Sequence, residues 1–566
     1  MLEPSDAREI LEAHDAYWSS KRRRMRQLKS LYMTHYWDNE PVLSNVSRRT
    51  EVPKAYAVVE SYLGSLYAKN PSVVVTPDLR ARGNAEVAEA TANQYLLTIR
   101  EQLEDATRLA LIYPCSFIKL APVESVDPLK RVSTSALAPW EVVLDVTAGS
   151  WSAQRYVGHV YLMPEDEALE RFNVSADQLR ARSYSKWIDQ TGSSGQGATL
   201  RDTGVDSSDK WVRVFEVYDL RADKLLVWSE DFNSGNSFLF EGIQVQVGAL
   251  PPDPDEQTPQ DDAAEVEHVT TGIPFKTASG RPVVPIVPLY LSRDPDTPLR
   301  GYSLLDRSYD QFRELNVLRT YQSQGVMRMA RQWMVRAGFF DDEAGAKIAE
   351  GRDGEFIEVD VPPGASIEGN IMPVPNAPIP ADITLYAQTV TSDINDAGLM
   401  APFTRGEVTN TTATEQRLLA DYTSSEVGRM ARTRDEVVTT VARTFNVMLA
   451  VMLGEEAEPL ALPNPIGPTM LSADDLTGDF GYFAQDAGST PMSDDIKRQS
   501  LERLAPLLLS LGADPTEVRE ELVRTYDLPT ALAAAPPPPP EPPALEEAPM
   551  AGPASDALPF PAPLGV

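Results

Sequence analysis

The sequence predicts an α+β protein that contains long helices. Two observations lead to this class. Between Cys115 and Asp231, several short segments alternate apolar and polar residues and are rich in β-branched side chains, which is typical of strands. From residue 301 onward, apolar residues instead recur at spacings of three and four over long proline-free runs, which is typical of helices.

The composition bounds the architecture and the partners. At 566 residues the chain is too long for one compact core, so we expect several subdomains. It carries 83 acidic and 51 basic residues, a formal net charge of -32. This charge argues against bulk electrostatic binding of nucleic acid. Any contact with DNA would be confined to a small surface or would be made while the DNA passes through.

Cysteine content and hydropathy limit the compartment. Cys115 is the single cysteine, so no intrachain disulfide can form, and its apolar surroundings, "LIYPCSFIKLA", predict a buried thiol. No segment approaches the roughly 18 uninterrupted apolar residues of a membrane span. Met1 opens directly onto polar sequence, so we expect neither a standard secretion signal nor an anchor.

The N-terminal part alternates helical and extended segments. Helical spacing is found over 5–36, 52–69 and 84–112. Within the first, "KRRRMR" at 21–26 could touch DNA or an acidic partner, but a solvated helix face is the favoured interpretation. The strands expected next are "CSFIKLAPV", "WEVVLDVTA", "RYVGHVYLM", "WVRVFEVYDL" and "KLLVWSED", and "RPVVPIVPLYLSR" has the prolines of an edge strand.

From residue 301 the pattern becomes that of a helical hairpin. Ser303 is a candidate N-cap, followed by an apolar stripe of Leu305, Tyr309, Phe312 and Leu315 that turns polar halfway along. A short strand, "EFIEVDV", then ends at two prolines, and a second helix is expected over about 381–397. The chain therefore goes out along one helix, forms a small α/β tip, and returns along another.

A very long helix follows a polar loop. In "LMAPFTRGEVTNTTATEQRLL", Thr412 and Glu415 form a T-x-x-E capping box. No proline occurs from there until Pro459, and Gly454 is a natural stop, so the helix could reach about 60 Å. We expect its apolar positions, which lie three and four residues apart, to be buried: Leu418, Tyr422, Val437, Val441, Phe445, Met448 and Met452.

The C-terminal part has two helical patterns within 492–529 and a proline-rich end. The sequence beyond Ala534 cannot build a core, so we expect a disordered tail that either tethers a partner or is dispensable. The acidic, proline-rich segment 251–267 has no assigned role.

No catalytic motif is found. The phosphate-binding loop, the H-E-x-x-H zinc site and the G-x-S-x-G elbow are all absent from the sequence. His14, His35, His159 and His268 are far apart, which favours surface or core roles over catalysis. We expect no catalytic residue, no cofactor and no metal. The Asp clusters at 339–343 and 472–479 lack EF-hand spacing, and solvated acidic surface is the favoured interpretation over a metal-dependent hydrolase.

Four segments of the chain, taken in their order along the sequence, resemble the portal proteins of tailed bacteriophages, the head-to-tail connector family. No short catalytic signature carries the resemblance; the ordered set does. The residues concerned are "VVESYLGSLYAKNPSVVVTP" (58–77), "RGYSLLDRSYDQFRELNVLRTYQSQGVMRMARQWMV" (300–335), "TATEQRLLADYTSSEVGRMARTRDEVVTTVARTFNVML" (412–449) and "MSDDIKRQSLERLAPLLLSLGADPTEVREELVRTYDLP" (492–529).

The resemblance implies a portal-like architecture of wing, stem, clip and crown, assembled into a ring with a central channel. Its expected parts are a wing over 1–298, a first stem helix over 299–336, a clip over 337–379, a second stem helix over 380–399, a channel loop over 400–411, a long helix over 412–454, a wing return with crown helices over 455–533, and a disordered tail over 534–566.

The function implied is structural and non-enzymatic. A portal forms a homo-oligomer, usually a dodecamer, at one capsid vertex of the virion, after assembly in the host cytoplasm. Double-stranded DNA passes through it during packaging and ejection. The implied partners are the terminase large subunit, the major capsid and scaffolding proteins, and head-tail adaptor or tail proteins, with no membrane.

The resemblance also suggests two sets of functional residues. The channel-loop residues proposed to face DNA are Thr404, Arg405, Glu407, Asn410 and Thr411. The clip residues proposed to contact partners are Phe339, Phe340, Glu355 and Glu358. Two other classes stay open at this point, a metal-dependent hydrolase and an adaptor that acts through the proline-rich tail.

Overall fold

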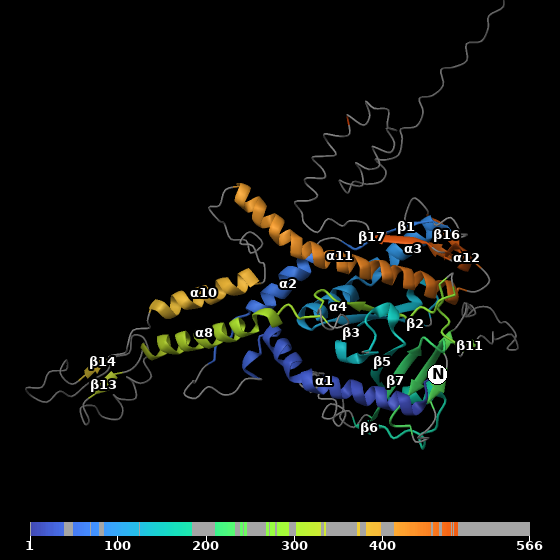
Figure 1. Ribbon diagram of the computed structural model, residues 1–566, viewed down its shortest axis with the longest axis horizontal. Coiled ribbons are helices and arrows are strands. Elements are labelled where there is room, and N and C mark those ends of the chain that lie inside the picture. The colour runs from blue at the N-terminus through green and yellow to red at the C-terminus, as the bar shows by residue number, and fades with distance from the viewer. Residues whose placement is uncertain are drawn as a thin grey trace, which may run out of the picture. The chain divides into compact units, whose positions relative to one another are not determined.

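Figure 1 shows the computed structural model of the chain, which forms two compact units, Met1–Thr490 and Pro491–Val566. All elements discussed below belong to the first unit. The structure describes residues 2–38, 49–67, 70–77, 84–123, 125–145, 147–183, 210–232, 238–241, 243–245, 268–270, 272–277, 280–293, 301–329, 333–335, 371–373, 381–397, 413–453, 457–462, 467–476, 478, 480–484 and 506.

Helices and strands both contribute, so the predicted α+β class is confirmed. The helices are α1 (Pro4–Tyr32), α2 (Lys54–Leu66), α3 (Ala85–Thr98), α4 (Arg100–Ile112), α5 (Glu165–Phe172), α8 (Tyr309–Met329), α10 (Ala381–Ala397), α11 (Ala413–Met452) and α12 (Ala473–Leu476). Short 3-10 turns are η1 (Tyr36–Asp38), η2 (Pro128–Lys130), η3 (Pro139–Glu141), η4 (Trp151–Ala153) and η5 (Asp306–Ser308).

The N-terminal helices follow their sequence signals with one exception. The buried residues of α1 include Leu11, Trp18, Met25 and Leu28, which share one helical face. The expected helical stretch over 84–112 is two helices, because the chain breaks at Ile99 between α3 and α4. Apolar spacing is similar on both sides of this break, so the periodicity gives no sign of it.

Two antiparallel sheets form the β part. One has the order β12-β2-β3, from β2 (Ser116–Pro122), β3 (Val132–Leu137) and β12 (Ile286–Leu289). The other has the order β4-β5-β7-β8-β9, with β6 also beside β7, from β4 (Val142–Leu144), β5 (Tyr156–Pro164), β6 (Arg182–Ser183), β7 (Lys210–Asp219), β8 (Lys224–Trp228) and β9 (Phe240–Glu241). The proline-containing β12 lies at a sheet edge, as predicted.

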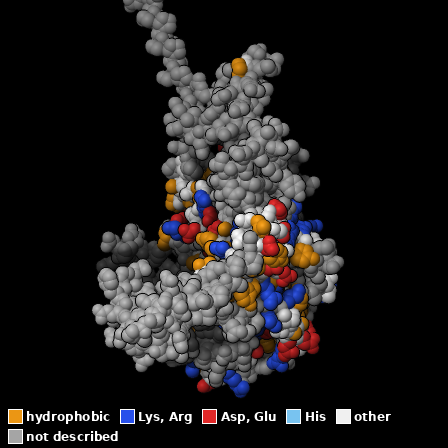
Figure 2. Space-filling view, turned by 90° about the vertical axis from the view of Figure 1, so that its left-hand side faces the viewer, with side chains coloured by type: hydrophobic (Ala, Val, Ile, Leu, Met, Phe, Trp, Pro, Cys, Tyr) orange, Lys and Arg blue, Asp and Glu red, His pale blue; other side chains and the backbone are white. Residues whose placement is uncertain are grey.

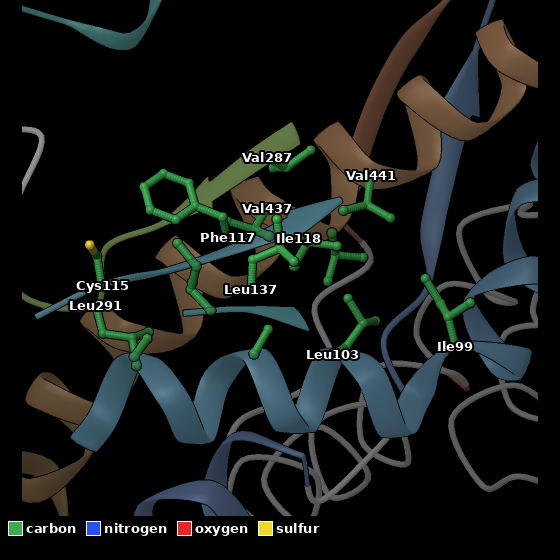
Figure 3. Close-up of a cluster of buried hydrophobic side chains, with 14 of the residues drawn as sticks. Ile99, Leu103, Cys115, Phe117, Ile118, Leu137, Val287, Leu291, Val437 and Val441 are labelled. Atoms are coloured by element: carbon green, nitrogen blue, oxygen red, sulfur yellow. The ribbon is translucent and has the colours of Figure 1, made fainter. Parts of the chain in front are cut away.

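Helices and the smaller sheet share one core. Figure 3 shows side chains converging from β2, β3, β12 and α11, with Ile99 and Leu103 beside them. Phe117, Ile118 and Val441 are almost fully buried there. Cys115 is buried in the same cluster, which confirms the prediction for its thiol. Segments separated by more than 300 residues therefore depend on one another for stability.

Four strand pairs lie outside the two sheets. β1 (Val73–Thr76) pairs with β17 (Gly481–Ala484), and β15 (Glu458–Ala461) with β16 (Pro468–Leu471). β10 (Ile243–Val245) pairs with β11 (His268–Thr270), and β13 (Trp333–Val335) with β14 (Ile371–Pro373). The pair of β15 and β16 is antiparallel although both strands contain proline, and Pro468 lies opposite Ala461 at its end.

The basic cluster of α1 is only partly a solvated face. Lys21, Arg23 and Arg26 are exposed, but Met25 is buried. Arg24 is held by Asp306, with Nε 2.7 Å from Oδ1, and its guanidinium lies over the Tyr309 ring. No helix in the described ranges combines the length and apolar character that crossing a bilayer requires.

Candidate functional site

The candidate site is the hairpin formed by α8 and α10, together with α11, the helix that follows it in the chain. α8 begins later than the sequence predicts. Ser303 does not cap it, since the helix starts at Tyr309 after η5. The Ser303 hydroxyl instead accepts a hydrogen bond from the Leu305 amide and donates one to the Leu111 carbonyl at the end of α4. Ser303 therefore ties the approach to α8 onto the end of α4.

Gly301 makes this approach possible. A Cβ at this position would lie 2.2 Å from the Ser292 carbonyl oxygen and 2.3 Å from that of Pro114. The Tyr302 amide donates to the same Ser292 carbonyl, at 2.9 Å. Only glycine lets the two backbones come this close.

The base of α8 is fixed by polar contacts to the segment before α2. The Thr320 hydroxyl accepts a hydrogen bond from the Thr50 amide (3.0 Å) and donates one to the Thr50 carbonyl (3.1 Å). The Asn316 side-chain oxygen accepts from the Val52 amide at 2.9 Å. The polar second half of the predicted stripe thus includes buried residues that bind backbone, because buried polar groups need partners.

α10 packs against α8, and Figure 1 shows the two helices side by side. α10 has the predicted bounds, and its buried residues Ala387, Val390 and Ile394 recur at helical spacing. The Tyr386 hydroxyl donates to the Glu314 carboxylate across the pair at 2.6 Å, and this bond raises the pKa of Tyr386. Only one narrow face of α10 is buried by its own chain.

The short strands β13 and β14 lie between the two helices in the sequence. β13 begins four residues after α8 ends, and β14 ends eight residues before α10 begins. Their antiparallel register, with Met334 opposite Met372, brings the two arms of the intervening segment together. The two helices therefore follow the predicted out-and-back path, but Trp333–Val335 was expected to belong to the first helix (299–336) and forms a strand instead. The strand expected at 355–361 lies outside the described residues.

α11 has 40 residues, from Ala413 to Met452, within two residues of the predicted 412–454. Among its described side chains, Val437, Val441, Phe445, Met448 and Met452 are buried, as predicted. Phe445 stacks on Tyr95 of α3, with ring centroids 3.7 Å apart. The C-terminal half of this helix is therefore part of the core that α11 shares with the smaller sheet.

Three polar anchors hold that half. Arg434 donates to the Leu66 carbonyl at the end of α2. The Asn446 amide donates to the Ala88 carbonyl at 3.0 Å. Arg131 binds the Glu458 carboxylate through both terminal nitrogens (2.8 and 2.6 Å) and also donates to the Met452 carbonyl. A cation at a helix C-terminus is stabilising because the last carbonyls are unpaired and partly negative.

A buried charged cluster, which no local pattern predicts, joins the two sheets. Lys119 of β2 donates to Glu216 of β7 at 2.8 Å and lies 3.0 Å from Nδ1 of His159 on β5. Burial and the positive charge of Lys119 together lower the pKa of His159 to about 3, so His159 is neutral and accepts this bond. Burial raises the pKa of Glu216, but the charge of Lys119 and the hydrogen bonds from Lys119 and Tyr218 together outweigh burial and lower that pKa to about 2.

The charged and polar groups of this cluster are paired with one another inside the core. The Tyr218 hydroxyl donates to the second Glu216 oxygen at 2.6 Å, which completes the partners of that carboxylate. His159 is a core histidine, one of the two roles that the sequence predicts for it. The contact of Lys119 with Glu216 joins two strands that are far apart in the sequence, so no local pattern predicts it.

A cavity of about 480 Å³ lies between α1 and the strands. Its walls are mainly apolar and aromatic, with Glu9, His14 and Cys115 among the lining residues. Nε2 of His14 lies 2.8 Å from the Trp140 carbonyl oxygen. Within the described part of the chain, no group of three or more His, Cys, Asp or Glu could hold a metal ion. In the 472–479 cluster, Asp475 accepts hydrogen bonds from the Ser472 amide and hydroxyl, as a helix-capping residue does.

The residues proposed for the two functional sets lie outside the described residues. These are Thr404, Arg405, Glu407, Asn410 and Thr411 of the loop, and Phe339, Phe340, Glu355 and Glu358 of the tip. Thr412, the acidic segment 251–267, the two helices expected within 492–529 and the tail also lie outside the described residues.

No protein-family model matches the chain, and no curated protein matches it. Among solved structures, the chain is similar to one in the virion of a native gene transfer agent particle, with a TM-score of 0.36 and 11% identity over 89% of this chain and 94% of that chain. A likeness at this level identifies neither a family nor a function.

Proposed function

We propose that this protein is a structural, ring-forming DNA conduit of the portal type, located at one capsid vertex of a virion. The observation that supports this most is the hairpin of α8 and α10 followed by α11. α10 ends at Ala397 and α11 begins at Ala413, so the segment proposed to face the channel joins the ends of these two helices. A loop held between helix ends is well placed to act at an axis.

The anchoring of α11 supports a mechanical role. Its C-terminal half is buried in the wing, so force on the loop would pass along a helix about 60 Å long into the rigid core. The net charge of -32 suits a wall along which a phosphate polymer slides, since many Lys and Arg contacts would hold the DNA.

In this proposal the copies form a ring, usually of twelve, and the tip between α8 and α10 meets the terminase large subunit and later the adaptor or tail proteins. The wing meets major capsid and scaffolding proteins. The chain itself performs no catalysis. Electron microscopy of the purified full-length protein should show rings with an axial hole wide enough for a duplex. A protein that stays monomeric under all assembly conditions would contradict the proposal.

The loop assignment has its own test. Arg405→Glu, or deletion of 404–410, should leave ring assembly intact and reduce the packaging or retention of DNA. Normal packaged-DNA yield from such particles would show that the loop does not act on DNA. Nuclease and peptidase assays with and without Mg²⁺ or Mn²⁺ address the alternative, a metal-dependent hydrolase, because a conduit should show no turnover.

A further inference from the structure

We propose that neighbouring copies associate head to tail through the hairpin, with an α8 face around Arg319 and Val326 packing on the acidic α10 face of the next copy. This inference rests on the proposed ring and specifies its contact. It is carried by the charges and apolar side chains that the hairpin leaves exposed.

The outer face of α10 is acidic throughout. Asp382, Asp393 and Asp396 are all exposed, and the 17-residue helix contains no Lys or Arg. Spacings of 11 and 3 residues place Asp382 and the other two on one side of the helix. Leu385, 59% exposed, lies on the same side, three residues after Asp382.

The exposed surface of α8 is complementary. Arg319 is exposed, and Val326, 61% exposed, follows seven residues later on the same side of the helix. A guanidinium beside an exposed valine matches a carboxylate beside an exposed leucine in both charge and hydrophobicity. A surface that combines a charged side chain with an exposed apolar one is more typical of a protein–protein interface than of a purely solvated face.

Within the described residues of one chain, the charges of these two faces have no ionic partner. α8 and α10 pack against each other, and their polar contact uses Tyr386 and Glu314. Within the described part of the chain, neither Arg319 nor any of the three aspartates makes an ion pair; Arg319 donates to Gln322 on its own helix. The matching surface therefore belongs to another molecule.

A second copy of this chain fits better than DNA. The α10 face would repel phosphates, and the exposed Leu385 and Val326 have no role in backbone binding. Because the α8 face differs from the α10 face, each copy carries both halves of the contact. Such heterologous contacts propagate from copy to copy and close into a ring when the rotation allows.

The test is a charge swap in the full-length protein, followed by sedimentation velocity and negative-stain microscopy. Arg319→Glu with Val326→Glu places acid against acid and should weaken assembly at least about tenfold, since juxtaposed like charges are costly. Adding Asp382→Lys and Asp396→Lys to that variant should restore most of the assembly. Wild-type assembly should also weaken as salt rises.

A matched control comes from the wing. Val126 and Lys130 are also strongly exposed, and Val126→Glu with Lys130→Glu makes the same change in charge and hydrophobicity. This variant should assemble like the wild type. Circular dichroism of all variants should show an unchanged helix content.

The outcomes separate the two proposals. Wild-type rings that tolerate the α8 variant as well as the control would overturn this contact and leave the conduit proposal standing. A weakened variant that the α10 changes do not rescue would overturn the pairing of these two faces. Closed dimers in place of rings would contradict the head-to-tail arrangement, and a monomeric wild type would contradict the conduit itself.

Discussion

The C-terminal half of α11 and the hairpin of α8 and α10 are both helical, but their surroundings differ. From Val437 to Met452, α11 buries most of its apolar side chains in the core that it shares with the smaller sheet, and it is held at its end by Arg131. The hairpin buries one narrow face of α10 and leaves Leu385, Tyr386, Tyr321 and Val326 exposed. The same secondary structure thus serves two purposes, internal stability in one region and external contact in the other.

Because of this difference, substitutions in the two regions can separate effects on folding from effects on assembly. Substitutions in the anchored half should change the free energy of unfolding of one chain. Substitutions on the outer face of the hairpin should change association and leave unfolding almost unaltered, because burial within the chain determines the cost of losing a side chain.

The largest effect is expected from Phe445→Ala. Phe445 is fully buried and stacked on Tyr95, so its removal leaves a cavity and should destabilise the chain by about 4 kcal/mol. Urea unfolding followed by far-UV circular dichroism measures this. Leu385→Ala on the hairpin is the control and should change stability by less than about 0.5 kcal/mol. Equal losses in the two variants would remove the contrast between the regions.

Arg131→Met should cost about 3 kcal/mol. It leaves the Glu458 carboxylate and the Met452 carbonyl without their cation in a largely buried place. Replacing Glu458 by Leu in the same chain should recover part of the loss, since the unpaired carboxylate is then gone. Arg100, which pairs with Glu104 on its own helix and whose side chain is 42% exposed, is the control, and Arg100→Met should cost no more than about 1 kcal/mol. A similar cost for both arginines would show that the α11 anchor contributes nothing beyond a surface pair.

Gly301→Ala tests the junction between the two regions. The new Cβ meets two backbone carbonyls, so the approach to α8 must shift, at a cost of about 2 kcal/mol. Gly428→Ala in α11 is the same substitution with no atom within 4 Å of the added methyl, and it should stabilise the chain by about 0.5–1 kcal/mol because alanine favours the helix. Thermal unfolding of the two variants should therefore shift in opposite directions. A shift in the same direction would contradict the close approach at Gly301.

Sequence reasoning succeeded where a local pattern decides the structure. The bounds of α10, the extent of α11 and the edge position of β12 all follow from helical spacing, capping residues and prolines near the element itself. It failed where partners lie far apart in the chain. The pairing of β1 with β17 joins residues about 400 positions apart. The cluster of Lys119 and Glu216, and the tie from Ser303 to Leu111, likewise depend on faces that meet only in the folded chain.

The candidate site divides in the same way. Its scaffold of out-and-back helices could be predicted, because each helix carries its own signals. The exposed faces of α8 and α10 were not predicted. Which face of each helix is exposed depends on which side the partner helix covers. The loop and tip residues came from a family resemblance, and their roles remain predictions.

The smallest effect expected is a pH dependence within the core. Burial raises the pKa of Glu141 to about 7, although the Ala138 amide donates to its carboxylate. A raised carboxyl pKa means that the folded state binds the proton more tightly than the unfolded one. Stability from this group is therefore full below about pH 4.5 and falls as pH rises toward 7. Glu141→Gln keeps the acceptor and removes the charge, so it should gain about 1 kcal/mol at pH 8 and nothing at pH 4.

The pKa of Asp145 is shifted in the opposite direction to that of Glu141. The hydrogen bond from Arg155, opposed by burial and reinforced by Thr147, lowers the pKa of Asp145 to about 2. Its contribution is full above about pH 4 and is lost as pH falls through 2. Asp145→Asn should therefore be destabilising at pH 7, with a loss that shrinks toward pH 2, while the gain from Glu141→Gln grows from pH 4 to pH 8. Chemical unfolding at five pH values would measure both trends. Parallel trends would mean that the folded chain does not hold these two carboxyl groups in opposite charge states.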